Sequence, residues 1–248
     1  MQRTELEAYL AEYLEVDKYR DYSPNGLQVE GRASVERLVS GVTASLQLLE
    51  AAIEARADAI LVHHGYFWRG EDARIVGARR RRIALLLAHD VNLFAFHLPL
   101  DGHADVGNNA ALGNVLGFRS SGRFGEQDLG MYADLDVAVT VGSLAAHITE
   151  RLKRAPLVIG AGSQPVRRVA WCTGAAQGYL EAAVTLGADL YVTGEISEHT
   201  VHLARETGVA FMAAGHHATE RYGVQALGAH LAARFRIDHR FIDIDNPV

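Results

Sequence analysis

The chain repeats one long segment of its own sequence, and this repeat limits the folds that it can adopt. The stretch from Val35 to His64 aligns without a gap on the stretch from Val166 to Glu195. The identical pairs are Val35 and Val166, Arg37 and Arg168, Leu49 and Leu180, Glu50 and Glu181, Ala51 and Ala182, Ala52 and Ala183, and Asp58 and Asp189. Strand–helix units can resemble one another by composition alone, but here the polar ends of the apolar runs match as well. Solenoid units are much shorter, so the repeat predicts two similar α/β halves.

In each half, two apolar runs end in residues that can bind a metal ion. These residues are His63, His64, His97 and Asp101 in the first half, and Glu195, His216 and Glu220 in the second. Neutral imidazole suits zinc, iron, manganese, cobalt or nickel, and a carboxylate can bridge two such ions. Ligands of open α/β sheets bind outside the carboxyl ends of the strands. We therefore expect a site for divalent transition metals in a cleft between the halves.

Apolar strand-like runs alternate with helical patterns along most of the chain, which predicts an α/β fold with mainly parallel or mixed sheets and helices outside. The predicted strands cover 38–42, 59–62, 92–96, a stretch near Val169, 189–192, 209–213 and 240–244. The predicted helices cover 5–14, 45–55, 78–88, 108–116, 143–152, 179–186, 197–206 and 218–234, and 97–107 is predicted to be a loop. We divide the chain into a first lobe (1–117), a connecting lobe (118–165) and a second lobe (166–248). The halves should pack closely enough to count as one domain.

Composition narrows the class of protein. The chain has 248 residues, a formal net charge of −6 and one cysteine. No apolar run is long enough to cross a bilayer, and the first helix lacks the features of a signal peptide. A single cysteine is compatible with a reducing compartment, so we expect a cytoplasmic protein. The negative charge argues against a dedicated nucleic-acid binder, which usually carries a basic surplus.

One local patch departs from this balance. The run from Arg79 to Arg82, with Arg74 nearby, is the most basic part of the chain. It could hold a phosphate-bearing substrate or nucleic acid. A solvated helix face or an ion-paired subunit contact is the favoured interpretation, because charge runs are usually solvated.

Each candidate ligand also has a structural alternative. Adjacent residues of a strand point to opposite faces, so His63 and His64 can share one cluster only where the strand ends. The alternative is that each is a hydrogen-bonded core or capping residue. Asp101 could instead cap a turn. His216 and Glu220 lie four positions apart at the start of a predicted helix, on one face. An ion pair there is the alternative to metal binding.

The remaining polar candidates are less closely tied to the metal. His97 could be a ligand, a residue that orients a ligand, or a residue that moves protons. We expect Glu195 to line the cleft without necessarily contacting metal. Cys172 is predicted to be a small buried hydrophobic residue.

Seven motifs of the chain resemble the NIF-three-like family, also called dinuclear metal-centre hexameric proteins and described as type-two GTP cyclohydrolase I homologues. The motifs are SPNGLQVEG (Ser23 to Gly31), GVTAS (Gly41 to Ser45), ADAILVHHGYFW (Ala57 to Trp68), HLPLDGHADVGNNA (His97 to Ala110), TGEISEH (Thr193 to His199), AAGHHATERYG (Ala213 to Gly223) and FIDIDNP (Phe241 to Pro247). They span nearly the whole chain, which is similar to the short bacterial form of the family.

The resemblance implies two similar α/β lobes, a two-metal site in the cleft and a toroidal homohexamer. By motif, the implied ligands of the two divalent ions are His63, His64, Asp101, His216 and Glu220, with Glu220 as the bridge. Two such ions can activate a water molecule as the nucleophile of a hydrolysis. The family has no settled substrate, although cyclohydrolase activity on GTP is attributed to some members.

Three functions remain open at this stage. The first is a metal-dependent hydrolase or cyclohydrolase acting on a nucleotide or a related small molecule, with His97, and next Glu195, as the proton-transfer residue. The second is a hexameric scaffold that engages nucleic acid or a protein, with structural metals. The third is metal storage or delivery. No interaction with a membrane is expected.

Overall fold

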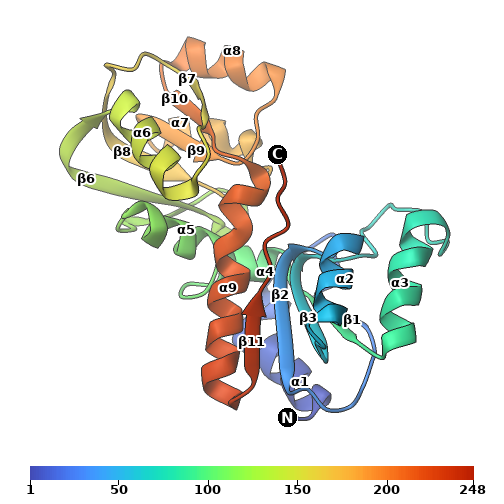
Figure 1. Cartoon of the computed structure of the whole chain (residues 1–248). Coiled ribbons are helices and arrows are strands. Elements are labelled where there is room, and N and C mark those ends of the chain that lie inside the picture. Colours follow the sequence, from blue (N-terminus) through green and yellow to red (C-terminus); the bar gives the residue numbers. More distant parts are fainter. The chain divides into compact units, whose positions relative to one another are not determined.

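The computed structural model describes residues 1–248, which form two compact units (Figure 1). The first unit comprises Met1–Gly107 and Gly223–Asp245, and the second comprises Asn108–Tyr222 and Asn246–Val248. Each unit is an α/β structure with its own sheet, as the alternation of patterns predicts.

The first unit is built on a five-stranded mixed sheet in the order β1-β4-β3-β2-β11. Its strands are β1 (Gly26–Val29), β2 (Arg37–Thr43), β3 (Ala59–His64), β4 (Asn92–Ala95) and β11 (Asp238–Phe241). The central strands β2, β3 and β4 are parallel, β11 is parallel to β2, and β1 is antiparallel to β4. The parallel strands therefore bring the ends of β3 and β4 to the same edge of the sheet.

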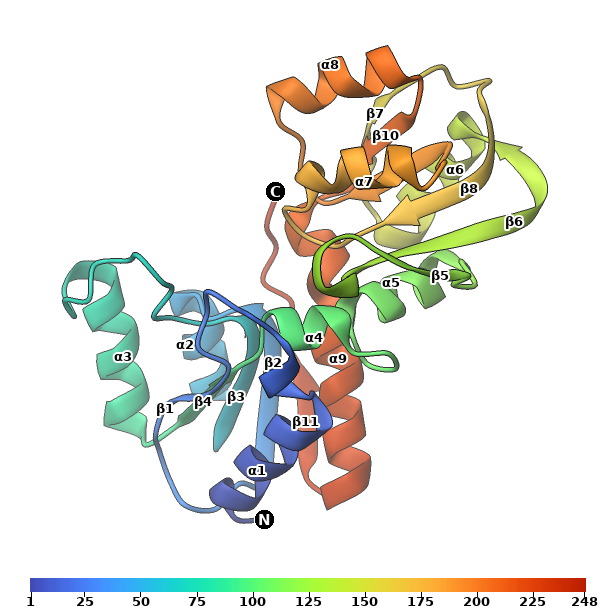
Figure 2. The ribbon, with the colours of Figure 1, turned by 180° about the vertical axis from the view of Figure 1, so that it is seen from behind.

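Helices cover both faces of this sheet (Figure 2). The helices of the unit are α1 (Arg3–Tyr13), the short 3-10 helix η1 (Val16–Lys18), α2 (Leu46–Glu54), α3 (Gly77–His89), α4 (Leu98–Gly102) and the last two-thirds of α9 (His216–Phe235). One apolar core joins α1 and α9 to Leu38, Leu61 and Phe94 of the sheet. A second core joins α2 and α3 to Val39 and Ile60, which alternate with those residues and point to the other face.

The second unit is built on a six-stranded mixed sheet in the order β5-β6-β8-β9-β10-β7. Its strands are β5 (Gly122–Phe124), β6 (Gly130–Thr140), β7 (Leu157–Ile159), β8 (Pro165–Trp171), β9 (Leu190–Thr193) and β10 (Ala210–Ala213). Here β8, β9 and β10 are parallel, and antiparallel strands flank them on both sides.

Helices also cover this sheet. They are α5 (Asn108–Leu116), η2 (Glu126–Asp128), α6 (Val141–Leu152), η3 (Gln177–Tyr179), α7 (Leu180–Thr185), α8 (Glu198–Thr207) and the start of α9. Buried residues of α5 and α6 pack on Val169, Trp171 and Val192 in one apolar core. Figure 1 shows α7 and α8 along the opposite face. Both units therefore have three layers, with a sheet between helices.

The aligned aspartates of the internal repeat make corresponding hydrogen bonds. Oδ2 of Asp58 accepts from the backbone N–H groups of Glu36 and Arg37, at 3.0 and 2.9 Å. Oδ2 of Asp189 accepts from the backbone N–H groups of Arg167 and Arg168, at 2.7 and 2.9 Å. Each carboxylate thus binds two successive backbone N–H groups, at the start of β2 and within the first half of β8.

The observed division of the chain differs from the one expected from the sequence. The segment 118–165 supplies β5, β6, α6 and β7 to the second sheet and its helical layer. The last strand, expected over 240–244 in the second lobe, lies at Asp238–Phe241 and pairs with β2 in the first unit. Strand partners are chosen by tertiary contacts, which the local pattern does not carry.

The prediction of a loop over 97–107 is wrong in its first part, where α4 forms. The backbone N–H groups of Leu100 and Asp101 donate to the carbonyl group of His97, at 2.9 and 3.1 Å. Pro99 lies at the start of this helix, where its fixed φ is favourable and its missing N–H costs nothing. The short helix places Asp101 on a buried face, with 8% of the residue exposed.

None of the helices combines the length and the hydropathy that a membrane span requires.

Candidate metal-binding site

The carboxyl edge of the first sheet gathers three imidazole rings. His63 and His64 end β3, and His97 follows β4. One nitrogen from each ring lies within 4.8 Å of the other two, which is a spacing that a metal ion can bridge. The rings of His63 and His64 are 4.5 Å apart although neighbouring strand residues alternate in direction. The strand end therefore brings both rings to one cluster, as expected.

His63 is held at one nitrogen and faces a carboxylate with the other. Its side chain is fully buried, and Nδ1 donates to the carbonyl oxygen of Phe96 at 2.9 Å. Nε2 lies 3.5 Å from Oδ1 of Asp101. The backbone contact fixes the orientation of the ring and directs Nε2 toward the acid.

The other two rings of this cluster are held in the same way. Nδ1 of His64 forms a 3.1 Å hydrogen bond with the hydroxyl group of Thr43 on the adjacent strand β2. Nδ1 of His97 donates to Oδ1 of Asp21 at 2.9 Å. An outer partner at Nδ1 is the usual support of a histidine that binds metal through Nε2.

Asp21 is a site residue that the sequence analysis did not identify. Its Oδ2 accepts from the side chain of Asn25 and from the backbone N–H of Leu98, at 3.0 and 2.9 Å. Burial by itself would raise the pKa of the Asp21 carboxyl group. Hydrogen bonds from the His97 ring, from Asn25 and from the backbone hold that pKa well below its usual range. Asp21 therefore remains a carboxylate that orients His97.

The loop that carries Asp21 also fixes the backbone of His97. The side-chain oxygen of Asn25 accepts from the backbone N–H of His97 at 2.7 Å. The signal for this network was present in the turn Ser23-Pro24-Asn25-Gly26, where Asp21 and Asn25 can bond to nearby backbone groups. Its link to a residue so distant in sequence could not be read from that turn.

Aromatic residues border the histidine cluster of the first unit. The Trp68 ring lies 5.0 Å from the His97 ring and 6.0 Å from the His64 ring. Tyr22 packs on Trp68 at 5.5 Å and is 52% exposed. Two aromatic rings, tilted by 37° to each other, thus lie next to the imidazole groups.

The second unit contributes one imidazole and two carboxylates. His216 begins α9, and its Nε2 lies 3.1 Å from Oε2 of Glu220, one helical turn later. Its Nδ1 donates to Oε1 of Glu195 at 2.6 Å. The predicted helical pairing of His216 with Glu220 is therefore confirmed, and Glu195 contacts the ring from the other side.

This cluster favours a positive charge between its two acids. Burial by itself would lower the pKa of His216, but the hydrogen bonds and charges of Glu220 and Glu195 raise it to about 9. Glu220 is buried, with 3% of the residue exposed. The ring proton occupies a position that suits a cation, and a metal ion binding at Nε2 would release that proton.

A glycine permits the close packing around Glu220. Gly174 has a φ of +69°, and a Cβ there would lie 2.1 Å from Oε1 of Glu220. Its backbone N–H donates to the hydroxyl group of Thr219 at 3.0 Å. Any larger residue would push the carboxylate out of place and would strain the backbone.

The four histidines of the two clusters share one geometry. Each Nδ1 is bound, by Phe96, Thr43, Asp21 and Glu195 for His63, His64, His97 and His216 respectively. Each ring therefore presents Nε2 as the nitrogen for a cation. The donor types of both clusters fit divalent transition metals, for which imidazole and carboxylate are ordinary ligands.

Two other predictions can be placed. Cys172 is buried, with 5% of the residue exposed, which confirms its expected role as a small hydrophobic residue. In the basic patch, Arg79 pairs with Glu71, and Arg74 pairs with Asp72 at 2.6 Å. Part of the patch is therefore engaged in local ion pairs within the chain.

Known relatives cover the whole chain. A Pseudomonas aeruginosa protein named GTP cyclohydrolase 1 type 2 homolog is 54% identical over 238 residues, covering 95% of this chain and 94% of that protein. An Escherichia coli protein with the same name is 48% identical over 248 residues and is covered completely, as is this chain.

Solved structures are similar over the same length. The structure of a protein called ybgI, whose function is described as unknown, matches with a TM-score of 0.95 and 47% identity. A Thermus thermophilus protein matches with a TM-score of 0.91 and 36% identity. Both matches cover 100% of each chain. The model of the Duf34/NIF3 (NGG1p interacting factor 3) family matches residues 1–247, and the chain therefore belongs to this family.

Proposed function

We propose that the chain binds two divalent transition-metal ions and is a metal-dependent hydrolase. The proposed ligands are His63, His64, Asp101, His216 and Glu220, with Glu220 as the bridge. The observation that carries the proposal is that each of the three histidine ligands is held by a hydrogen bond at Nδ1, which leaves its Nε2 for a metal ion. Such outer bonds orient the ring of a histidine that binds metal.

The groups that bind Nδ1 of the histidine ligands are of two kinds. A backbone carbonyl group and a hydroxyl group support His63 and His64. A carboxylate supports His216, which increases the basicity of the ring and strengthens its bond to a cation. Glu195 therefore acts in this proposal through His216, as a residue that positions a ligand.

When bound, the ions would lower the pKa of water and polarise the bond to be cleaved. Proton transfer would fall to His97, because its Nδ1 donates to the buried carboxylate of Asp21. That contact holds the ring in one tautomer, with Nε2 able to accept a proton, and stabilises the imidazolium ion formed afterwards. His97 is thus the proposed general base and acid.

The substrate class is proposed from two observations. The relatives from Pseudomonas aeruginosa and Escherichia coli carry the name GTP cyclohydrolase 1 type 2 homolog. The aromatic surface of Tyr22 and Trp68 beside His97 suits stacking of a flat heterocycle. We therefore propose GTP or a related nucleotide or heterocycle as the substrate.

Assembly into a homohexamer is part of the same proposal and rests on membership of the family. Exposed apolar residues in and before α3 give the assembly some surface to bury, because Ile75, Val76 and Leu87 are 51%, 56% and 60% exposed. Ile83 and Leu86 face the core of their own unit and would not contribute. Light scattering at micromolar concentration should give a mass near six chains, and a strict monomer would contradict the hexamer.

The test of the function combines metal analysis with an activity screen. Protein purified in the presence of Zn²⁺, Fe²⁺, Mn²⁺, Co²⁺ or Ni²⁺ should retain about two ions per chain by elemental analysis. Each form is then assayed on GTP, followed by pterin fluorescence, and on phosphate esters and cyclic amides. A chain that retains no metal would overturn the proposal. Retained metal without turnover of any substrate would favour a scaffold or metal-delivery function instead.

A further inference from the structure

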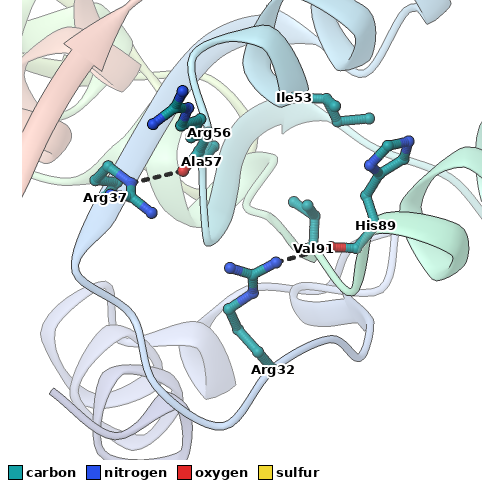
Figure 3. A pocket seen from close by; sticks show the side chains of 7 residues that line it. All are labelled: Arg32, Arg37, Ile53, Arg56, Ala57, His89 and Val91. Atoms are coloured by element: carbon teal, nitrogen blue, oxygen red, sulfur yellow. Dashed lines mark hydrogen bonds between the residues drawn. The ribbon is translucent and has the colours of Figure 1, made fainter.

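A cavity of about 300 Å³ lies in the first unit at the amino edge of its sheet. It is lined by Arg32, Arg37, Ile53, Arg56, Ala57, His89 and Val91 (Figure 3). Arg37 begins β2, Ala57 precedes β3, and Val91 precedes β4. In parallel strands these positions are at the end of the sheet opposite to His63 and His64, so the cavity is separate from the histidine cluster.

The cavity carries more positive charge than its own acid can balance. The carboxylate of Asp58 accepts from Nη1 of Arg32 at 2.8 Å and lies 3.7 Å from Nη2 of Arg37. Arg56 has no ion pair and is exposed. The imidazole of His89 is also exposed and lines the same space. Three guanidinium groups and a histidine therefore line a cavity whose one neighbouring carboxylate, that of Asp58, pairs with only two of them.

The second unit has fewer arginines at the amino edge of its sheet than the first unit has. Arg168 is the counterpart of Arg37 in the internal repeat, and it pairs with its own acid, Asp134, at 2.7 Å. Gly187, with a φ of +75°, is the counterpart of Arg56. A cavity of about 170 Å³ at the amino edge of that sheet is lined by a single charged residue, Arg205. The first unit therefore has two arginines at this edge, Arg32 and Arg56, beyond the one that the repeat places in both units, and Arg56 has no ion pair.

The shape and lining of the first cavity indicate what this surplus would bind. Guanidinium groups present several N–H donors in a planar fork that matches the oxygens of phosphate. Ile53 and Val91 add an apolar wall beside the charged groups. A volume near the lower end of the range for ligand sites limits the occupant to a small molecule.

We propose that this cavity binds the phosphate group of a small phosphate ester, with the organic part of the ester against Ile53 and Val91. Arg56 contacts the phosphate group, together with Arg37, whose Nε donates to the carbonyl oxygen of Arg56 at 2.7 Å. The imidazole of His89 adds a further N–H donor. Arg32 is held by Asp58 and by the carbonyl oxygen of His89, at 2.8 Å each, and contributes charge. The site requires no metal ion and acts independently of the proposed hydrolase site.

The test measures binding of two probes to the metal-loaded protein by calorimetry. Inorganic phosphate tests the charged part of the cavity, and phenylphosphonate adds an apolar group on a bond that phosphatases do not cleave. Wild-type protein should bind both probes, and phenylphosphonate more tightly. The Arg56→Gly variant should bind each probe about tenfold more weakly, the effect of losing one charge-assisted contact.

The controls separate this site from its alternatives. Arg56 has a φ of +57°, and glycine occupies the equivalent position in the second unit, so Arg56→Gly should fold normally. Arg205→Ala, in the smaller cavity, should leave binding unchanged. Glu220→Ala should lose metal but keep probe binding. If binding follows Glu220 and not Arg56, or if wild-type protein binds neither probe, the proposal is wrong while the metal site can still stand.

Discussion

The two units hold their strands in the same way but carry different chemistry at the strand ends. Asp58 and Asp189 make matching hydrogen bonds at the amino edges of the two sheets. At the carboxyl edges, β3 ends in His63 and His64, whereas the aligned segment after β9 supplies Glu195. The two halves of the repeat thus keep the same hydrogen bonds at the amino edges of their sheets, while the residues at the carboxyl edges differ.

The two clusters therefore differ in the numbers of nitrogen and oxygen atoms that they offer as metal ligands. The first unit offers three imidazole groups and the carboxylate of Asp101. The second offers one imidazole group between Glu195 and Glu220. If the clusters share two ions, removing an acid and removing an imidazole should have unequal consequences.

The largest expected effect is on metal content. Glu220→Ala should reduce binding from about two ions to none, because a bridging carboxylate serves both ions. His64→Ala should remove mainly one ion. Elemental analysis of the purified variants, with circular dichroism to confirm folding, distinguishes them. Equal losses in the two variants would refute a bridging role, and Glu220→Gln provides a variant closer in shape if the alanine form does not fold.

The next effect is on turnover and compares the two acids that support histidine rings. His97→Ala should keep most of the metal yet lose roughly 10²–10⁴-fold in rate, the usual span for a general acid or base. Asp21→Asn should lower the rate by acting through His97. Glu195→Gln should weaken metal binding, because Glu195 supports His216. Metal content and kcat measured on the same samples would show whether His97 is instead a ligand, in which case both fall together.

A smaller effect concerns stability and compares the two aspartates of the repeat. Asp58→Ala should destabilise the first unit by about 3 kcal/mol, because it also leaves Arg32 without its buried partner. Asp189→Ala should cost the second unit about 1–2 kcal/mol. Each unit contains one tryptophan, Trp68 or Trp171. In proteins that keep only Trp68 or only Trp171, tryptophan fluorescence during urea unfolding follows one unit at a time. Equal losses of unfolding free energy in Asp58→Ala and Asp189→Ala would contradict this prediction.

The smallest effect is a pH dependence confined to the first unit. Burial lowers the pKa of His239, whose ring packs against Gly228 of α9 and bonds to Ser40 at 2.8 Å. The unfolded chain therefore binds a proton at His239 more readily than the folded chain does. Stability is lost as the pH falls below about 6.5, the ordinary histidine value, and is recovered above it.

The comparison that isolates this group is between wild type and His239→Gln. Between pH 7.5 and pH 5.5, the unfolding free energy of wild type should fall more than that of the variant. The difference should be less than about 1 kcal/mol, since the ring is only half-buried and solvent screens its charge. Parallel pH profiles for the two proteins would show that His239 does not contribute.

Much of the fold follows from local patterns. The helix over Asn108–Leu116 and the strand starting at Ala59 lie where periodicity predicts them, and most other elements differ by a few residues at their ends. Helical and strand periodicity are local properties of the sequence, which explains this agreement. The alignment of Asp58 with Asp189 further indicates that each aspartate has the same place in its sheet, where it accepts hydrogen bonds from the backbone of the neighbouring strand.

The candidate residues were also visible before the structure, because strand ends and helix starts can be located by pattern. The spacing of His216 and Glu220 fixes their contact on one face of a helix. Asp21 could not be found in this way, since its bond to His97 joins two loops that are distant in sequence.

The α/β class, the repeat and the residue types that can bind metal follow from the order of the amino acids. The pairing of β11 with β2, the burial of Asp101 by α4 and the hydrogen-bond partner of each imidazole nitrogen follow only from the folded chain. The structure also showed that Arg32, Arg37 and Arg56 line one cavity, although the sequence drew attention to the arginine run on α3. Local periodicity is set by neighbouring residues, whereas strand pairing, burial and hydrogen-bond partners depend on contacts between segments far apart in the chain.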